Sequence, residues 1–164
     1  MVTTRLSVFM SDLQCAAIML IARHGEAEQA VDGVLSGRDV SLTDKGRAQG
    51  HHLVGQVRPR RVAAVYSSRI DTVVESAGDL EAASLHDERR FAEAIGEIAD
   101  VHRGETVLVF SHGGAMSPAI PRLSVNVGNN LAGQGFLPNC AVAEVEVDAD
   151  GWRLVSWPGA SEQA

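Results

Sequence analysis

The chain has 164 residues, of which 45% are apolar and 21% charged, and its formal net charge is −7 at pH 7. This length fits one domain that can bury a sizeable single core. The negative charge disfavours general binding to nucleic acid or to an anionic membrane, because their phosphates would repel the chain. It does not exclude a local pocket for an anion.

The N-terminal residues are expected to form an extension and not a targeting signal. Asp12 and Gln14 interrupt the early apolar run, and no small-residue cleavage site follows it. The longest uninterrupted apolar run, 15–22, is far too short to span a bilayer. The expected organisation is an extension over 1–15, one domain over 16–158 and a tail over 159–164.

The two cysteines, Cys15 and Cys140, cannot define a disulfide framework and have no CxxC spacing. We expect two reduced, buried thiols in a reducing compartment. The expected location is therefore cytoplasmic.

The first half of the chain alternates short apolar runs with helical patterns. Runs at 16–22 and 62–66 predict buried strands. Between them a helix is expected to begin after Thr43, a favourable N-cap, and to end near Val57. A second helix is expected over about 70–82.

The second half continues the alternation. The clearest amphipathic helix covers 87–102, a third buried strand covers 106–110, and Gly113 opens another helix. After a glycine-rich loop over 124–138, residues 141–157 alternate apolar and polar positions around an Asp-Gly turn, which predicts an edge hairpin. The expected fold class is α/β: a three-layer sandwich whose mainly parallel central sheet is flanked by helices, with a C-terminal edge hairpin.

Two histidines occupy matching places in this pattern. His24 follows the first strand and His112 follows the third, and ligands of open α/β sheets bind outside such strand ends. Gly25 and Gly113 come next, which lets the backbone turn and approach a ligand closely. Arg23 adds a planar guanidinium suited to phosphate. A single such histidine is usually a solvated turn residue, but two matched sites favour an anion-binding active site.

These segments resemble the signature blocks of the histidine phosphatase (phosphoglycerate mutase-like) superfamily. The matching segments, in family order, are 23–26 (RHGE), 37–49 with its LT-x-x-G-x-x-Q pattern, 65–68 (VYSS), 111–114 (SHGG) and 137–139 (LPN). Together they span about residues 17–157. They are specific for the superfamily and not for a substrate.

The resemblance implies a metal-independent phosphatase that needs no cofactor. His24 would attack phosphorus and become phosphohistidine, while Arg23 and His112 would bind the phosphoryl oxygens. Water would then hydrolyse the intermediate. The implied partner is a phosphorylated small molecule or a phosphoprotein. Further candidates for phosphate or substrate binding are Gly25, Arg38, Arg69 and Gly113.

Two branches of the superfamily fit different parts of the chain. The compact length and the run 23–28 (RHGEAE) resemble the short phosphohistidine phosphatases. The loop 32–37 and the SHGG block look more like small-molecule phosphatases of the mutase branch. Mutase activity itself is disfavoured, since the segment that would enclose a phosphosugar acid is missing.

Some positions depart from the family pattern. The arginine of the family's SS-x-x-x-R block aligns with Thr72, and Arg69 is the nearest replacement. An asparagine common six residues after the first histidine is Ala30 here. A catalytically weakened or inactive relative, which binds phosphate, a ligand or a protein partner, is therefore the alternative to an enzyme.

The acidic proton donor of the family has no clear counterpart. The segment that usually carries it is reduced to about 78–86, which leaves Glu26 and Glu81 as the main candidates and Asp87 and Glu88 nearby. For each of them a solvated surface carboxylate is the simpler interpretation. The same shortening predicts an open pocket that accepts bulky phosphoesters and phosphopeptides as well as small ones.

Overall fold

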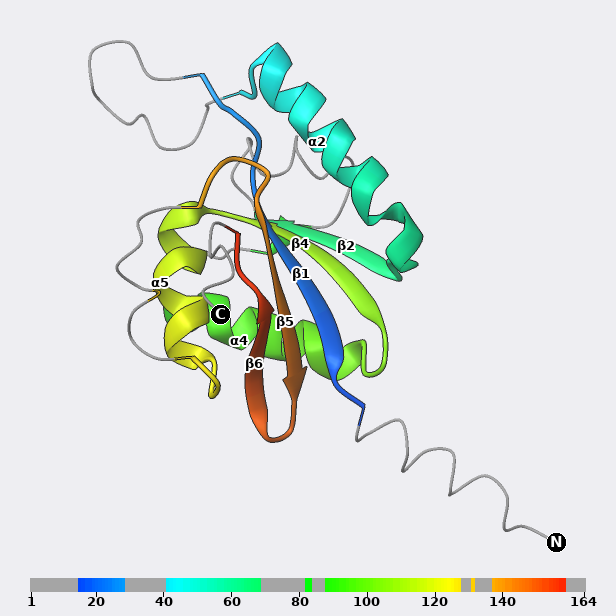
Figure 1. Cartoon of the computed structure of the whole chain (residues 1–164), viewed down its shortest axis with the longest axis vertical. Helices are drawn as coiled ribbons and strands as arrows, with labels where there is room; N and C mark the ends of the chain where they lie inside the picture. Colours follow the sequence, from blue (N-terminus) through cyan, green and yellow to red (C-terminus); the bar gives the residue numbers. More distant parts are fainter. Residues whose placement is uncertain are drawn as a thin grey trace, which may run out of the picture.

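The computed structural model of the chain describes residues 15–28, 41–68, 82–83, 88–127, 131 and 137–158. Its centre is a six-stranded sheet with the strand order β3-β2-β4-β1-β5-β6 (Figure 1). The strands are β1 (Ala17–Arg23), β2 (Ala64–Ser68), β3 (Ala82–Ala83), β4 (Thr106–Ser111), β5 (Val142–Asp148) and β6 (Gly151–Ser156). The first four strands run parallel, and β5 and β6 form an antiparallel hairpin at one edge.

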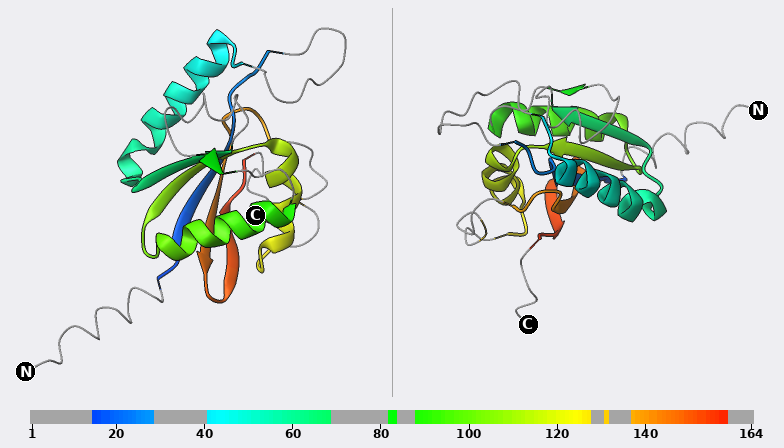
Figure 2. Two further views of the ribbon diagram at one scale, coloured as in Figure 1. Left: turned by 180° about the vertical axis from the view of Figure 1, so that it is seen from behind. Right: turned by 90° about the horizontal axis from the view of Figure 1, so that it is seen from above.

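Helices cover both faces of the sheet (Figure 2). On one face lies α2 (Asp44–Val57), followed by a short 3-10 turn, η1 (Arg58–Arg60). On the other face lie α4 (Glu88–Val101) and α5 (Gly113–Leu123), which contact each other. This is the predicted three-layer α/β sandwich. No helix in the described part of the chain is both long and apolar enough to cross a membrane.

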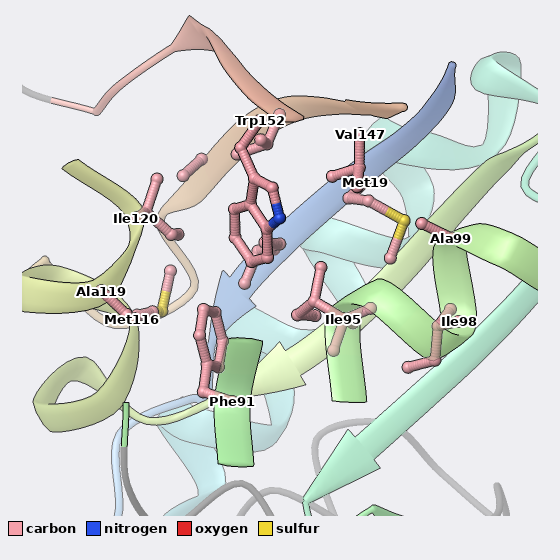
Figure 3. Close-up of a cluster of buried hydrophobic side chains, with 14 of the residues drawn as sticks. Met19, Phe91, Ile95, Ile98, Ala99, Met116, Ala119, Ile120, Val147 and Trp152 are labelled. Carbon is pink, nitrogen blue, oxygen red and sulfur yellow. The ribbon is translucent and has the colours of Figure 1, made fainter. Parts of the chain in front are cut away.

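The sheet is buried on both faces because successive side chains of its central strands point in opposite directions. On β1, Met19 faces α4 and α5, whereas Leu20 faces α2 beside Leu53. The larger core, on the α4 side, packs Phe91 against Trp152 with ring centroids 6.1 Å apart (Figure 3). Apolar runs such as 17–22 are continuous for this reason: both of their faces leave water.

Most predicted elements lie within two residues of their observed bounds. Thr43 caps α2 as expected, since its Oγ1 accepts a hydrogen bond from the backbone N–H of Gly46 at 3.0 Å. The helix expected over 70–82 is wrong at its end, because Ala82 lies in β3 and pairs with Ser67 of β2. Pairing with a distant strand overrides the helix propensity of alanine there. The other residues of that segment lie outside the described ranges.

Neither thiol is fully buried, so the expectation of burial is wrong for Cys15 and only partly met for Cys140. Cys140 is half-buried, but Cys15 is exposed, because it precedes the first core residue of β1.

The loop after β1 packs directly on the first turn of α2. A Cβ atom on Gly46 would lie 1.9 Å from the carbonyl oxygen of Glu26, and one on Gly25 would lie 2.4 Å from the carbonyl oxygen of Gly46. The carbonyl oxygen of Glu26 also accepts a hydrogen bond from the backbone N–H of Thr43 at 3.0 Å. Two backbones therefore touch, and only glycine permits that approach.

This contact gives a stability prediction. Gly46→Ala should lower the free energy of unfolding by roughly 1–3 kcal/mol, because the new methyl group overlaps backbone that cannot move without strain. The matched control is Gly55→Ala on the same helix, where a Cβ atom meets nothing within 4 Å. That variant should gain about 0.5–1 kcal/mol, as alanine usually does in a helix. Urea unfolding measures both, and equal shifts in the two variants would contradict the close approach.

Candidate active site

Parallel pairing of β1 with β4 brings the two predicted histidines together. In this register Arg23 lies opposite Ser111, so both chains leave the sheet at the same edge. The backbone N–H of His24 extends the ladder by one more hydrogen bond, to the carbonyl oxygen of Ser111 at 3.1 Å. The rings of His24 and His112 then lie with centroids 5.7 Å apart and planes inclined by 61°. One tetrahedral anion can contact two rings at this separation.

Arg23 lies beside the same pair of rings. Its Nη1 donates a hydrogen bond to the carbonyl oxygen of Leu137. Its guanidinium lies on Gly113, where an added Cβ atom would be 3.3 Å from Nε. The Nε atom itself is buried and has no hydrogen-bond partner. Burial lowers the pKa of the guanidinium, which nevertheless stays charged at neutral pH. A buried cationic donor without an acceptor is costly, so this position favours an anion.

The tautomer of His24 follows from one hydrogen bond. Its Nδ1 lies 2.7 Å from the carbonyl oxygen of Gly25. A carbonyl oxygen can only accept, so Nδ1 carries the proton and Nε2 of the neutral ring keeps its lone pair. Burial lowers the pKa of His24; the bond to Gly25 opposes this shift, and the positive charge of Arg23 adds to it. The neutral, nucleophilic form of the ring is therefore favoured at pH 7.

The N-terminus of α5 lies at the same site as Arg23 and His24. His112 is the N-cap residue, with extended backbone angles, and its carbonyl oxygen accepts hydrogen bonds from the backbone N–H groups of Ala115 and Met116. The helix therefore directs the positive end of its dipole to the edge where His24 and Arg23 lie. Gly114 in the first turn is exposed, with open space where a Cβ atom would point.

Glu26, one of the candidate proton donors, contacts the first turns of α2. Its carboxylate accepts hydrogen bonds from Lys45 Nζ at 2.6 Å and from Thr43 Oγ1 at 3.2 Å. Its backbone N–H donates to Gln49 Oε1 at 2.8 Å. The hydrogen bond from Lys45 is the main cause of a lowered pKa of this carboxyl. Through these contacts Glu26 joins the loop after β1 to α2.

Some of the other predicted site residues lie within the described ranges, and others lie outside them. Arg38, Arg69 and Glu81 lie outside them, and so do Ala30 and Thr72. Gly25 and Gly113 are buried at the site; the backbone of Gly46 leaves no room for a side chain at Gly25, and the Arg23 side chain packs closely on Gly113.

The carbonyl oxygen of Leu137 was not predicted as a contact of Arg23. A backbone acceptor gives no residue-type signal, and the 137–139 block was the only pointer to it. Within the described residues, no group of three or more His, Cys, Asp or Glu side chains could hold a metal ion.

The chain is similar to known proteins over most of its length. The sequence profile of the histidine phosphatase superfamily (branch 1) matches residues 19–86 and 85–159. Phosphoglycerate mutase-like protein 4 of Arabidopsis thaliana is 32% identical over 114 residues, which are 66% of this chain and 46% of that protein. The chain thus aligns with less than half the length of that relative.

Solved structures share the fold. YhfR of Bacillus stearothermophilus superposes with a TM-score of 0.72 at 21% identity, over 89% of this chain and 98% of that one. The protein histidine phosphatase SixA, complexed with tungstate, superposes with a TM-score of 0.65 at 17% identity, over 85% and 94%. At these identities the likeness establishes the α/β architecture and nothing finer.

The contact between Arg23 and Gly113 predicts how the anion site responds to one methyl group. Gly113→Ala should weaken binding of inorganic phosphate about tenfold, a loss of ~1.4 kcal/mol, because Arg23 must shift away. Gly114→Ala adds the same group one residue later, in open space, and should change the affinity by less than about twofold. Calorimetric titration measures both. Equal affinities would mean that the methyl group at position 113 does not displace Arg23 from the anion site.

The ionisation of His24 gives a second prediction. Its imidazole should titrate below pH 6.5 in the folded protein, because burial and Arg23 disfavour the cation. Arg23→Gln removes the nearby positive charge and should raise the pKa of His24. Histidine ring resonances followed by NMR against pH report both values. A fall in the pKa of His24 on removal of Arg23 would refute the assigned electrostatics.

Proposed function

The chain belongs to the histidine phosphatase superfamily, and from this premise we propose that it hydrolyses phosphomonoesters or phosphohistidine without a metal, through a phosphohistidine intermediate on His24. The observation that carries the proposal is the state of His24. Its Nδ1 is committed to Gly25, which leaves Nε2 available beside His112 and the unpartnered Nε of Arg23. A nucleophile and two cationic or dipolar groups then converge where a phosphoryl group would bind.

In the first proposed step, Arg23 and His112 hold the phosphoryl oxygens while Nε2 of His24 attacks phosphorus. The P–N bond forms as the bond to the leaving oxygen breaks. Charge developing on the phosphoryl oxygens is stabilised by the guanidinium and by the N-terminal end of α5. Groups held in place by the fold reduce the reorganisation needed at the moment of transfer.

In the second proposed step, water attacks the phosphohistidine. The P–N bond breaks, inorganic phosphate leaves, and His24 returns to its neutral form. The leaving oxygen of the first step needs a proton when the leaving group is poor. Glu26, whose pKa is lowered by the hydrogen bond from Lys45, and Glu81 are the proposed candidates for this donor.

The proposed substrates include phosphoproteins as well as small phosphoesters. SixA, which shares the fold, is a protein histidine phosphatase and was complexed with tungstate. By analogy, an oxyanion would lie between Arg23, His24 and His112 in this chain. The short segment around 78–86 supports access for bulky substrates. The second candidate function is a non-catalytic phosphate-binding relative, which the engagement of Glu26 with Lys45 favours.

The test uses an aryl phosphate, whose good leaving group needs little protonation. His24→Ala should abolish turnover while the protein stays folded, because the ring is not part of either apolar core. His112→Ala should retain about a hundredth to a thousandth of the turnover, by analogy with loss of one oxyanion donor. His51→Ala, an exposed histidine on α2, is the matched control and should match wild type.

The same samples are quenched in single-turnover experiments to trap the phosphoenzyme. A wild-type protein without turnover and without trapped phosphate would establish the non-catalytic alternative. Full turnover in His24→Ala would overturn the assignment of the nucleophile.

A further inference from the structure

The chain segment 137–141, here called the 137–141 clamp, holds the backbone that carries the nucleophile. The side chain of Arg23 donates to the carbonyl oxygen of Leu137, and its backbone N–H donates to that of Ala141 at 3.0 Å. The backbone N–H of Cys140 donates to the carbonyl oxygens of Arg23 at 3.0 Å and of His24 at 3.3 Å. The clamp therefore contacts both Arg23 and His24 of the proposed anion site, although it lies more than a hundred positions away in the sequence.

Asn139 adds the one side-chain contact of the clamp to the nucleophile. Its Nδ2 donates a hydrogen bond to the carbonyl oxygen of His24 at 3.1 Å. His24 is the first residue beyond β1, so the regular β1 ladder no longer fixes its peptide group. On the N–H side the carbonyl oxygen of Ser111 holds it, and on the carbonyl side Asn139 and Cys140 hold it.

A tight turn aims the amide of Asn139. The backbone N–H of Ala141 donates to the carbonyl oxygen of Pro138 at 3.1 Å, which closes a four-residue turn. Cys140 has a φ of 56°, the positive value that a type II turn requires at its third position. A non-glycine residue adopts such a φ at a cost, so the turn is held by its surroundings. Its geometry presents the Asn139 side chain and the Cys140 N–H to one carbonyl oxygen.

We propose that Asn139 is a positioning residue for His24, a deduction that rests on the proposed function. Its amide fixes the carbonyl of His24, and the next carbonyl along, that of Gly25, fixes the ring through Nδ1. Loss of the amide leaves this carbonyl with only the longer hydrogen bond from the backbone N–H of Cys140, which loosens the peptide between them and with it the direction of Nε2. Small misplacements of a nucleophile reduce phosphoryl transfer strongly, because proximity and alignment supply much of the rate.

The experiment compares Asn139→Ala with a matched control. Asn126→Ala is the same substitution at an asparagine whose side chain also bonds backbone groups, namely the N–H and carbonyl of Leu154 at the β6 edge. Asn139→Ala should lower kcat for an aryl phosphate about tenfold to a hundredfold, with KM changed by less than about threefold, since Arg23 and His112 remain. Asn126→Ala should keep wild-type kcat and KM.

A third variant separates hydrogen bonding from shape. Asn139→Asp keeps the volume and lacks the N–H donor, so it should lose at least as much kcat as Asn139→Ala. If Asn139→Ala lowers kcat only because it weakens packing, Asn139→Asp should restore kcat, since aspartate has nearly the same volume as asparagine. Recovery in Asn139→Asp, or equal kcat in Asn139→Ala and wild type, overturns the positioning role.

An NMR measurement decides the inference even if the wild-type protein has no turnover. The ¹⁵N shifts of His24 should report the Nδ1–H tautomer in wild type and in Asn126→Ala, and a mixture of tautomers in Asn139→Ala. Absence of wild-type turnover would refute the proposed function. An unchanged tautomer in Asn139→Ala would refute the positioning role, whichever way the activity assay turns out.

Discussion

The pairing of β1 with β4 is the constraint on which the site depends. A histidine directly follows each strand, and the parallel register sets Arg23 beside Ser111. His24 and His112 consequently leave neighbouring strands at one edge, with their rings 5.7 Å apart. A slip of the register by one residue would turn every apolar side chain of β1 to the wrong face. The two cores of the sheet therefore fix the relative position of the histidines.

The polar groups at this edge are held from several directions. The 137–141 clamp holds Arg23 and His24 from one side, and the Gly25–Gly46 contact holds the following loop against α2. Glu26 secures the same loop through Lys45 and Thr43. The outcome is a cation with a buried donor that has no hydrogen-bond partner, next to a neutral imidazole.

Local patterns made much of this predictable. The apolar runs predicted the strands, and Thr43 predicted the start of α2. The His-Gly pairs predicted that both histidines lie at strand ends. Features formed by distant residues were not predictable in the same way. The ion pair of Glu26 with Lys45 of α2 joins residues that are distant in the sequence, and Ala82 pairs with β2 instead of lying in a helix. The contacts of Leu137 and Asn139 span 114 and 115 positions and use backbone acceptors, which carry no sequence signature.

Nε2 of His24 is the proposed reacting atom, because Nδ1 is hydrogen-bonded to Gly25. The direct measurement is the linkage of the phosphate in a trapped phosphoenzyme, identified by ³¹P–¹⁵N correlation in protein labelled at histidine nitrogen. We expect one phosphohistidine, at His24, with phosphorus bonded to Nε2. Phosphorus on Nδ1, or on His112, would contradict the proposed tautomer and the assignment of the nucleophile.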